Sequence, residues 1–323
     1  MAPKTLDILC YHAVSPGARP LNDYCFMPVE TFRAHMRWLR GSRFDVLPLK
    51  EAAAALAEGR LKRRTVAITF DDGFRNNATV ALPVLEEFGL PATIFLSTGF
   101  IGTQKTTWAA RVTRALIDTQ AQALDYGGKR LPLTDFDARA AANREVQRMI
   151  KAIAPANPQA EVAAIETQLG VPVDPDLADD ADFAMMSAAE VARVQAGGLV
   201  DFGGHSVSHP ILSALDDAAL ADEVTGSVKA VAALTQSPCE TFAYPNGQPA
   251  DFDDRALELL RKAGVTVAAT TTQLVNKRGA DPLRLNRWVL GGGVQVPRLK
   301  ATLMGLHPNQ IRHRLRGLTS ARA

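Results

Sequence analysis

The chain contains little cysteine. Three residues, Cys10, Cys25 and Cys239, are spread over 323 positions, and no two of them have a Cys-x-x-Cys spacing. A disulfide framework needs an even set of cysteines, and a thiolate metal site needs closely spaced ones. The scarcity therefore argues against both, and we expect three buried free thiols.

Long apolar runs and a strong charge of either sign are also missing. No stretch approaches the ~20 apolar residues that a membrane span requires. Lysine and arginine number 36 against 34 aspartate and glutamate, and the resulting net charge of +2 gives no reason to expect a nucleic-acid partner. Residues 5–11 are too short and too interrupted for a signal peptide, and no small-residue cleavage site accompanies them. We therefore expect a cytoplasmic protein.

The apolar content of 47% is ample for a core, and it is arranged as alternating strands and helices. Short apolar runs, bounded by turn residues and separated by helical spacing, predict strands at residues 6–11, 44–47, 65–70, 92–96, 200–203, 241–243, 265–270 and 287–290. This alternation is typical of parallel βα units around a sheet or barrel, in which the site lies at the carboxyl ends of the strands.

Residues from about 101 to 186 interrupt this alternation. The stretch is polar, mostly helical in its spacing and punctuated by prolines, which indicates a helical insertion or lid. We expect a helical tail at about 297–323. The whole chain, residues 1–323, is then a single α/β domain with these two additions.

Two neighbouring aspartates, Asp71 and Asp72, end the strand predicted at residues 65–70 and are followed by Gly73. Adjacent side chains on a strand point to opposite faces, but at the end of a strand a glycine lets both carboxylates turn toward one cavity. Two carboxylates that close repel each other, so a cation holds one of them or the pKa of one rises. The question is which partner this pair has.

His205 and His209 follow the strand predicted at residues 200–203 and are four positions apart. On a helical turn this spacing places both imidazoles on one face, within reach of one cation. Two imidazoles and a carboxylate are suitable ligands for Zn²⁺ or another first-row divalent ion. Surface or capping histidines can have the same spacing, but the aspartates at another strand end favour a metal site. One aspartate would then bind the cation and the other would act as a general base.

A third predicted strand, at residues 241–243, is followed by Tyr244, Pro245, Asn246 and Gly247. A Pro-Asn-Gly corner can present backbone N–H groups to a developing oxyanion. The same residues also form ordinary tight turns, and for this segment alone that interpretation is the stronger one.

Together, residues 69–73, 205–209 and 242–247 resemble, in order, the first three motifs of the polysaccharide deacetylases, also called carbohydrate esterase family 4 or the NodB-homology family. The resemblance extends from about residue 8 to residue 290, outside the insertion. It implies a distorted (β/α)7 barrel and a hydrolase that removes N- or O-acetyl groups from sugars with a divalent metal, usually zinc. Asp71 would be the base, and Asp72, His205 and His209 would be the metal ligands.

The resemblance also gives the third segment a role. The backbone N–H of Asn246 would help the metal to stabilise the tetrahedral intermediate, and Tyr244 and Phe242 would shape the wall of the site. In the family, this motif usually begins with an arginine that steadies the catalytic aspartate, whereas this chain has Ala243 there. Arg284 or Arg287 would have to supply that charge from another strand.

A second family motif, Leu-x-His, is missing as well. Its histidine protonates the leaving amine, but here no histidine follows the strand at residues 265–270 until His307. His12, just after the first strand, is the candidate acid, and the pair Tyr11-His12 resembles the branch that includes the poly-N-acetylglucosamine deacetylases. The alternative is a structural histidine at a strand end.

Other residues are open to two interpretations. Trp108 begins the insertion and is suited either to stacking on a sugar ring or to burial in the insertion core. His35 and His313 are expected to be surface or packing residues. The basic segment 311–316 could favour an anionic membrane surface or a phosphorylated carrier, although a solvated helix end is the simpler explanation.

These features predict a metal-dependent hydrolase that deacetylates an N-acetylated amino sugar or glycan. A deacylase or deformylase of a nucleotide-linked or lipid-linked sugar, or of another small amide, would keep the same fold and metal. A degenerate member that binds glycan without catalysis is the third hypothesis, and the intact aspartate and histidine pairs argue against it.

Overall fold

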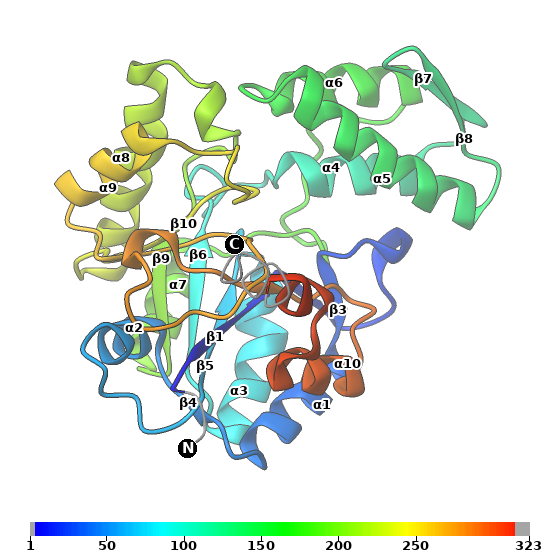
Figure 1. The fold of residues 1–323 in the computed structure, drawn as a ribbon. Coiled ribbons are helices and arrows are strands. Elements are labelled where there is room, and N and C mark those ends of the chain that lie inside the picture. The colour runs from blue at the N-terminus through cyan, green and yellow to red at the C-terminus, as the bar shows by residue number, and fades with distance from the viewer. Residues whose placement is uncertain (1–3, 314–323) are drawn as a thin grey trace, which may run out of the picture.

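The apolar runs of the sequence form a curled parallel sheet at the centre of the computed structural model, which describes residues 4–313 (Figure 1). Seven strands are paired in the order β11 (Val267–Ala269), β10 (Thr241–Ala243), β9 (Val200–Gly204), β6 (Ala92–Leu96), β5 (Thr65–Phe70), β1 (Leu6–Tyr11) and β12 (Trp288–Val289). A further strand, β4 (Asp45–Val46), pairs with the start of β5, and all these pairings are parallel. Within residues 4–313 the edge strands β11 and β12 do not pair with each other, so the barrel is incomplete.

Burial on both faces explains the continuous apolar strands in the sequence. Every residue of β1 and β5 is buried, as expected for a parallel sheet that is covered on both sides. Alternate residues of these strands enter different apolar clusters. Leu6, Ile8 and Ala67 belong to one cluster, whereas Leu9 and Ile68 belong to a larger one.

Helices connect successive strands around the sheet. They are α1 (Val29–Arg40), α2 (Leu49–Ala57), α3 (Leu82–Phe88), α7 (Ala188–Ala196), α8 (Asp217–Thr235) and α9 (Asp254–Lys262). Because the strands are parallel, each helix returns the chain to the amino end of the next strand. The carboxyl ends of the strands therefore meet at one rim, where a site can be assembled.

The insertion forms its own small cluster of elements beside the sheet (Figure 1). It contains α4 (Trp108–Asp118), α5 (Phe136–Ile153), α6 (Pro158–Leu169) and an antiparallel hairpin of β7 (Ala123–Tyr126) and β8 (Lys129–Pro132). We had predicted helices and no hairpin here. The missed signal is Gly127-Gly128, whose φ angles of 55° and 74° suit a two-residue turn between strands. The treatment of the whole chain as one domain stays a prediction.

The chain after β12 continues through α10 (Val296–Ala301), the π-helical turn η5 (Thr302–Leu306) and a helical turn that includes His313. The second half of the basic segment at residues 311–316 lies outside the described residues. Among residues 4–313, no helix is both long and apolar enough to cross a membrane.

Candidate active site

The strand ends and the insertion enclose a cavity of about 620 Å³. Its floor includes the five residues that we predicted at strand ends, and its insertion wall includes Trp108, Gln147 and Lys151. The floor residues are His12, Asp71, Asp72, His205 and His209. They come from the segments after β1, β5 and β9, so the sheet brings together residues almost 200 positions apart.

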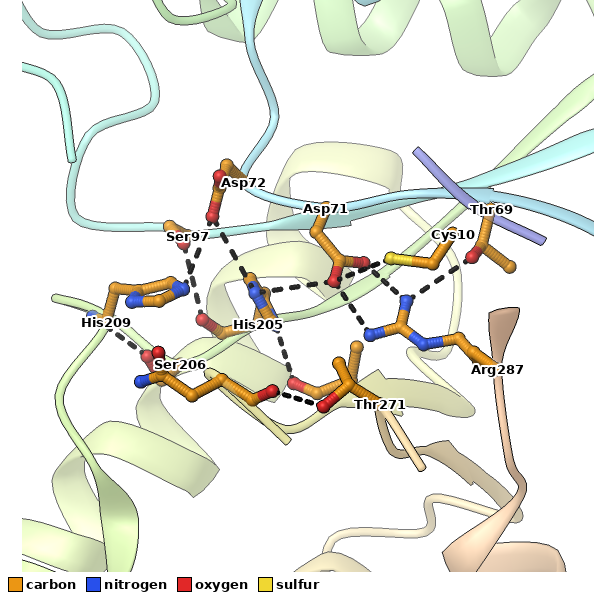
Figure 2. A network of polar contacts seen from close by, with 12 residues as sticks. Cys10, Thr69, Asp71, Asp72, Ser97, His205, Ser206, His209, Thr271 and Arg287 are labelled. Carbon is orange, nitrogen blue, oxygen red and sulfur yellow. Dashed lines mark hydrogen bonds and ion pairs between the residues drawn. The ribbon is translucent and has the colours of Figure 1, made fainter. Parts of the chain in front are cut away.

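The end of β5 turns sharply at the two aspartates. Asp72 has a φ of 73° and Gly73 a φ of 88°, and the Gly73 N–H donates to the Asp71 carbonyl at 3.0 Å. A Cβ at position 73 would approach the Leu96 side chain to 2.8 Å, so the turn requires glycine both for its φ and for its close packing. This turn directs both carboxylates toward the histidines (Figure 2).

Asp71 is held by Arg287 in a buried, two-pronged ion pair (Figure 2). Arg287 Nη1 lies 2.6 Å from Asp71 Oδ1, and Nη2 lies 2.7 Å from Oδ2. Burial alone would raise the pKa of Asp71, but the Arg287 guanidinium and the nearby His205 hold that pKa well below its usual range. Arg284, the other candidate, pairs with Asp254 at the surface.

Cys10, which sequence reasoning did not place in the site, also contacts the base candidate. Its Sγ lies 3.5 Å from Asp71 Oδ2 and donates to it (Figure 2). Burial raises the pKa of the Cys10 thiol well above its usual value, so it stays a protonated donor. Cys10 and Cys239 are buried as expected. Cys25 is only half-buried, because its loop lines the cavity, which corrects our expectation for that thiol.

The two histidines lie on a loop, and our prediction of a helical turn there is wrong. Ser206 and His209 have φ angles of 63° and 62°, which no helical turn contains. The carboxylate of Glu223 on α8 accepts the N–H groups of Val207 and Ser208 at 2.7 and 2.9 Å and stabilises the loop. The imidazoles still come together, with ring centroids 4.9 Å apart.

Asp72, His205 and His209 form a compact triad of possible ligand atoms. Asp72 Oδ1 lies 3.7 Å from His205 Nε2 and 3.4 Å from His209 Nε2 (Figure 2). Burial and the neighbouring Asp71 charge raise the pKa of Asp72 to about 8. Asp72 Oδ1 is buried without a hydrogen-bond donor among the described residues. A buried carboxylate oxygen with no donor is suited to binding a cation.

Both histidines have the neutral imidazole form that binds metal ions. His205 Nδ1 lies 2.7 Å from the Ala243 carbonyl, which can only accept, so Nδ1 carries the proton and the Nε2 lone pair faces Asp72. Burial lowers the pKa of both imidazoles, and for His209 the reduction is large. One carboxylate oxygen and two imidazole nitrogens are a typical donor set for a divalent metal with open positions. The residues present therefore fit such an ion.

His12 lies beside the base candidate. Its ring nitrogen, Cys10 Sγ and an Asp71 carboxylate oxygen all lie within 4.8 Å of one another. Burial lowers the pKa of His12 to about 4, although the Asp71 charge opposes the change. Its carbonyl accepts the Asn77 amide at 2.7 Å, which fixes the backbone at this position.

The corner at Pro245, Asn246 and Gly247 lies at the cavity wall. Asn246 has a φ of 57°, and no described residue accepts a hydrogen bond from its N–H. Thr271, which sequence reasoning missed, donates from Oγ1 to the Asn246 carbonyl at 2.5 Å and so orients the corner (Figure 2). A single half-buried threonine gives no signal in the sequence for such a contact.

Tyr244 and Phe242 do not shape the wall directly, contrary to our expectation. Both are fully buried, and neither is among the residues that line the cavity. The Tyr244 ring stacks on Phe252 at 3.8 Å, and its hydroxyl donates to the Leu283 carbonyl. Trp108 is 2% exposed and packs in the insertion core, and it also lines the cavity, so its stacking on a sugar ring stays a prediction. His35 is a packing residue that contacts the Tyr11 hydroxyl, and His313 is exposed.

Comparison with known proteins gives one family. The profile of the family described as "Polysaccharide deacetylase" matches residues 58–268. A putative polysaccharide deacetylase, YxkH of Bacillus subtilis, is 39% identical over 101 residues, which are 31% of this chain and 34% of that protein. The poly-beta-1,6-N-acetyl-D-glucosamine N-deacetylase of Staphylococcus epidermidis is 34% identical over 86 residues, 27% of this chain and 29% of that protein. These alignments thus span about a third of each relative.

Solved structures share the fold across nearly the whole chain. The Streptococcus pyogenes deacetylase PplD, in complex with acetate, has a TM-score of 0.61 at 16% identity and covers 94% of this chain and 99% of its own. IcaB from Ammonifex degensii has a TM-score of 0.60 at 19% identity, with coverages of 94% and 98%. The predicted distorted barrel is therefore confirmed.

Proposed function

Because this chain belongs to the polysaccharide deacetylase family, we propose that it is a metal-dependent hydrolase that removes the N-acetyl group from an amino sugar or glycan. One observation carries the proposal: a buried triad of Asp72, His205 and His209 lies beside a second aspartate that an arginine keeps ionised. The first group can hold a cation, and the second can accept a proton. Hydrolysis of an amide needs both functions.

Asp72, His205 and His209 would hold the divalent ion, for which zinc is our choice because two imidazoles and one carboxylate suit it. When bound, such an ion supplies Lewis-acid chemistry that polarises a carbonyl and makes water more acidic. That chemistry matches the properties of Asp71. A carboxylate with so low a pKa is a weak base and needs an acidic proton donor.

Asp71 would accept the proton of the attacking water. Arg287 fixes both carboxylate oxygens, and Cys10 contacts Oδ2, so the base has one orientation before substrate arrives. The N–H of Asn246 would donate to the acetyl oxygen as negative charge develops there. Both groups are preorganised, so little free energy is needed to align them during the reaction.

His12 would deliver a proton to the departing amine nitrogen. At neutral pH its imidazole is neutral, because burial holds its pKa near 4. It must therefore collect a proton during the reaction, and Asp71, which has taken one from water, lies within 4.8 Å. Asp71 takes one proton from water and His12 passes one proton to the amine, so the reaction needs no other proton donor.

The substrate is proposed from the relatives and from the cavity. The staphylococcal relative acts on poly-beta-1,6-N-acetyl-D-glucosamine, as its name states. The cavity of about 620 Å³ is large enough for more than an acetyl group, and its amide and aromatic lining suits sugar hydroxyls and ring faces. We therefore place an N-acetylated amino sugar of a glycan chain in it.

The test is acetate release from N-acetylglucosamine oligomers by the purified chain. Treatment with a chelator should abolish release, and added Zn²⁺ should restore it. Nucleotide-linked and lipid-linked N-acyl sugars belong in the same panel, because faster turnover of one of these would redirect the substrate assignment. If no N-acyl sugar is hydrolysed with any first-row divalent ion present, the proposal is wrong.

A further inference from the structure

A buried aspartate outside the reaction centre joins the insertion to the barrel. Asp23 follows the 3-10 turn η1 (Pro20–Asn22) and precedes β3 (Phe26–Pro28), and it is 5% exposed. Among residues 4–313, no lysine, arginine or histidine lies within ion-pair distance of its carboxylate. A buried carboxylate without a cation is costly unless neutral donors surround it.

Neutral donors from two insertion helices surround this carboxylate. Three side chains converge on Asp23 Oδ2, each at 2.9 Å: the Thr113 hydroxyl of α4, and the Asn143 and Gln147 amides of α5. All three are nearly or fully buried. The other oxygen, Oδ1, accepts the Cys25 N–H at 3.0 Å. Asp23 is therefore the common acceptor of α4, α5 and its own loop.

The groups that Asp23 holds line the active-site cavity. Gln147 on α5 and Tyr24 and Cys25 on the loop are all part of the cavity wall. The Tyr24 ring meets the His12 ring edge to face, with centroids 6.0 Å apart, and the Cys25 carbonyl accepts the Ala13 N–H next to His12. On the other side, Gly292 N–H donates to the Tyr24 carbonyl at 3.1 Å.

From this arrangement we propose that Asp23 is a positioning residue, which sets Tyr24 and Gln147 relative to His12 and so fixes the wall against which the sugar is held. A carboxylate is the only kind of side-chain group that suits all of the groups around Asp23. It accepts from four donors at once and donates nothing. An asparagine fits the same space, but whichever way its amide is turned, its NH₂ group faces one of the present donors.

The test uses Asp23→Asn and a double variant that moves the carboxylate from position 23 to position 143. In Asp23→Asn with Asn143→Asp, one carboxylate and one amide remain in the network, and the hydrogen bond between positions 23 and 143 runs in reverse. The first readout needs no activity: the rate at which a thiol reagent labels Cys25 in the native protein, followed by mass spectrometry. Cys10 and Cys239 are buried and serve as internal references.

We expect Cys25 labelling to accelerate several-fold in Asp23→Asn and to return toward the native rate in the double variant. The second readout rests on the deacetylase function proposed above. The kcat for an N-acetylglucosamine oligomer should fall by roughly ten-fold in Asp23→Asn with an unchanged metal content, and recover in the double variant. If no deacetylation is found at all, the proposed function fails, and the labelling experiment still decides the role of Asp23.

Val162→Ala is the matched control for simple loss of stability. Val162 is fully buried in the insertion core on α6 and does not line the cavity. It should lower the melting temperature without changing Cys25 labelling or kcat. A native labelling rate in Asp23→Asn, or the same acceleration in Val162→Ala, would overturn the proposal. So would a folded double variant that remains as impaired as the single one.

Discussion

At the scale of single residues, Arg287 supplies the positive charge beside Asp71. In the polysaccharide deacetylases, this charge usually comes from an arginine in the motif that residues 242–247 resemble. Its guanidinium reaches Asp71 across 216 positions of sequence and is fully buried. From the sequence, Arg284 and Arg287 were equal candidates, because both lie in the short segment 283–288. The choice depends on which one points into the sheet, and no local pattern contains that information.

Replacement of Arg287 by glutamine should lower kcat/KM by more than ~100-fold. It leaves a buried carboxylate unpaired, which costs about 3–5 kcal/mol, so the melting temperature should fall as well. Arg287 lowers the pKa of Asp71, so its loss raises that pKa and the acid limb of the pH–rate profile moves to higher pH. Arg284→Gln is the control, since Arg284 pairs at the surface. A native profile in Arg287→Gln would contradict the assigned pairing.

Replacement of His12 by glutamine should lower kcat by about 100-fold, which is in the range for loss of a general acid. Bound metal, measured by elemental analysis, should be unchanged, because His12 is not part of the triad of Asp72, His205 and His209. A variant that turns over at the native rate would make His12 a structural residue at the end of β1.

At the scale of elements, the histidine loop depends on a helix that follows it. Glu223 of α8 accepts two backbone N–H groups of the loop and the Ser208 hydroxyl. These contacts stabilise a backbone with two left-handed residues, and this is why the expected helical turn did not form. The four-residue spacing correctly indicated that the imidazoles meet, but the spacing alone does not determine the backbone that brings them together.

Glu223→Gln should weaken metal binding by ten-fold or more without removing a ligand, as is common for residues that orient metal ligands. The neighbouring change Asp222→Asn removes the same charge from an exposed position and should leave the affinity unchanged. Competition with a chromophoric chelator measures both. Equal affinities in the two variants would show that the loop keeps its shape without Glu223.

The strands whose bounds the sequence predicts are those that are buried on both faces of the sheet. The bounds of β1, β5, β6 and β10 agree with the predicted strands at both ends. The hairpin of β7 and β8 was missed because β8 has no buried residue and so forms no apolar run, and β7 alone, with its four residues, is too short to indicate a strand. The wrong expectation for Tyr244 has a similar origin: its ring packs on Phe252 in a later loop, which strand patterns do not reveal.

At the scale of the whole molecule, the proposed metal site would link metal binding to folding. The triad places a carboxylate with an unpaired oxygen and two neutral imidazoles in the interior, so the metal-free protein carries a desolvation cost. A saturating divalent ion should raise the free energy of unfolding by about 2.7 kcal/mol at a concentration 100 times the dissociation constant. Thermal melts with and without Zn²⁺ should show the shift, and Asp72→Asn should reduce it strongly. A shift of native size in Asp72→Asn would place the metal elsewhere.

The order of the sheet has a practical consequence for how much of the chain is needed. The family profile matches residues 58–268, yet Arg287 and His12 lie beyond its two ends, next to β12 and β1. A polypeptide trimmed to the matched segment would keep the proposed metal ligands. It would lose both Arg287, which pairs with the proposed base Asp71, and His12, the proposed proton donor. It would also expose the edge of β5 that β1 now covers, and a bare apolar strand edge invites aggregation. The segment that identifies the family is thus shorter than the segment that the proposed chemistry requires.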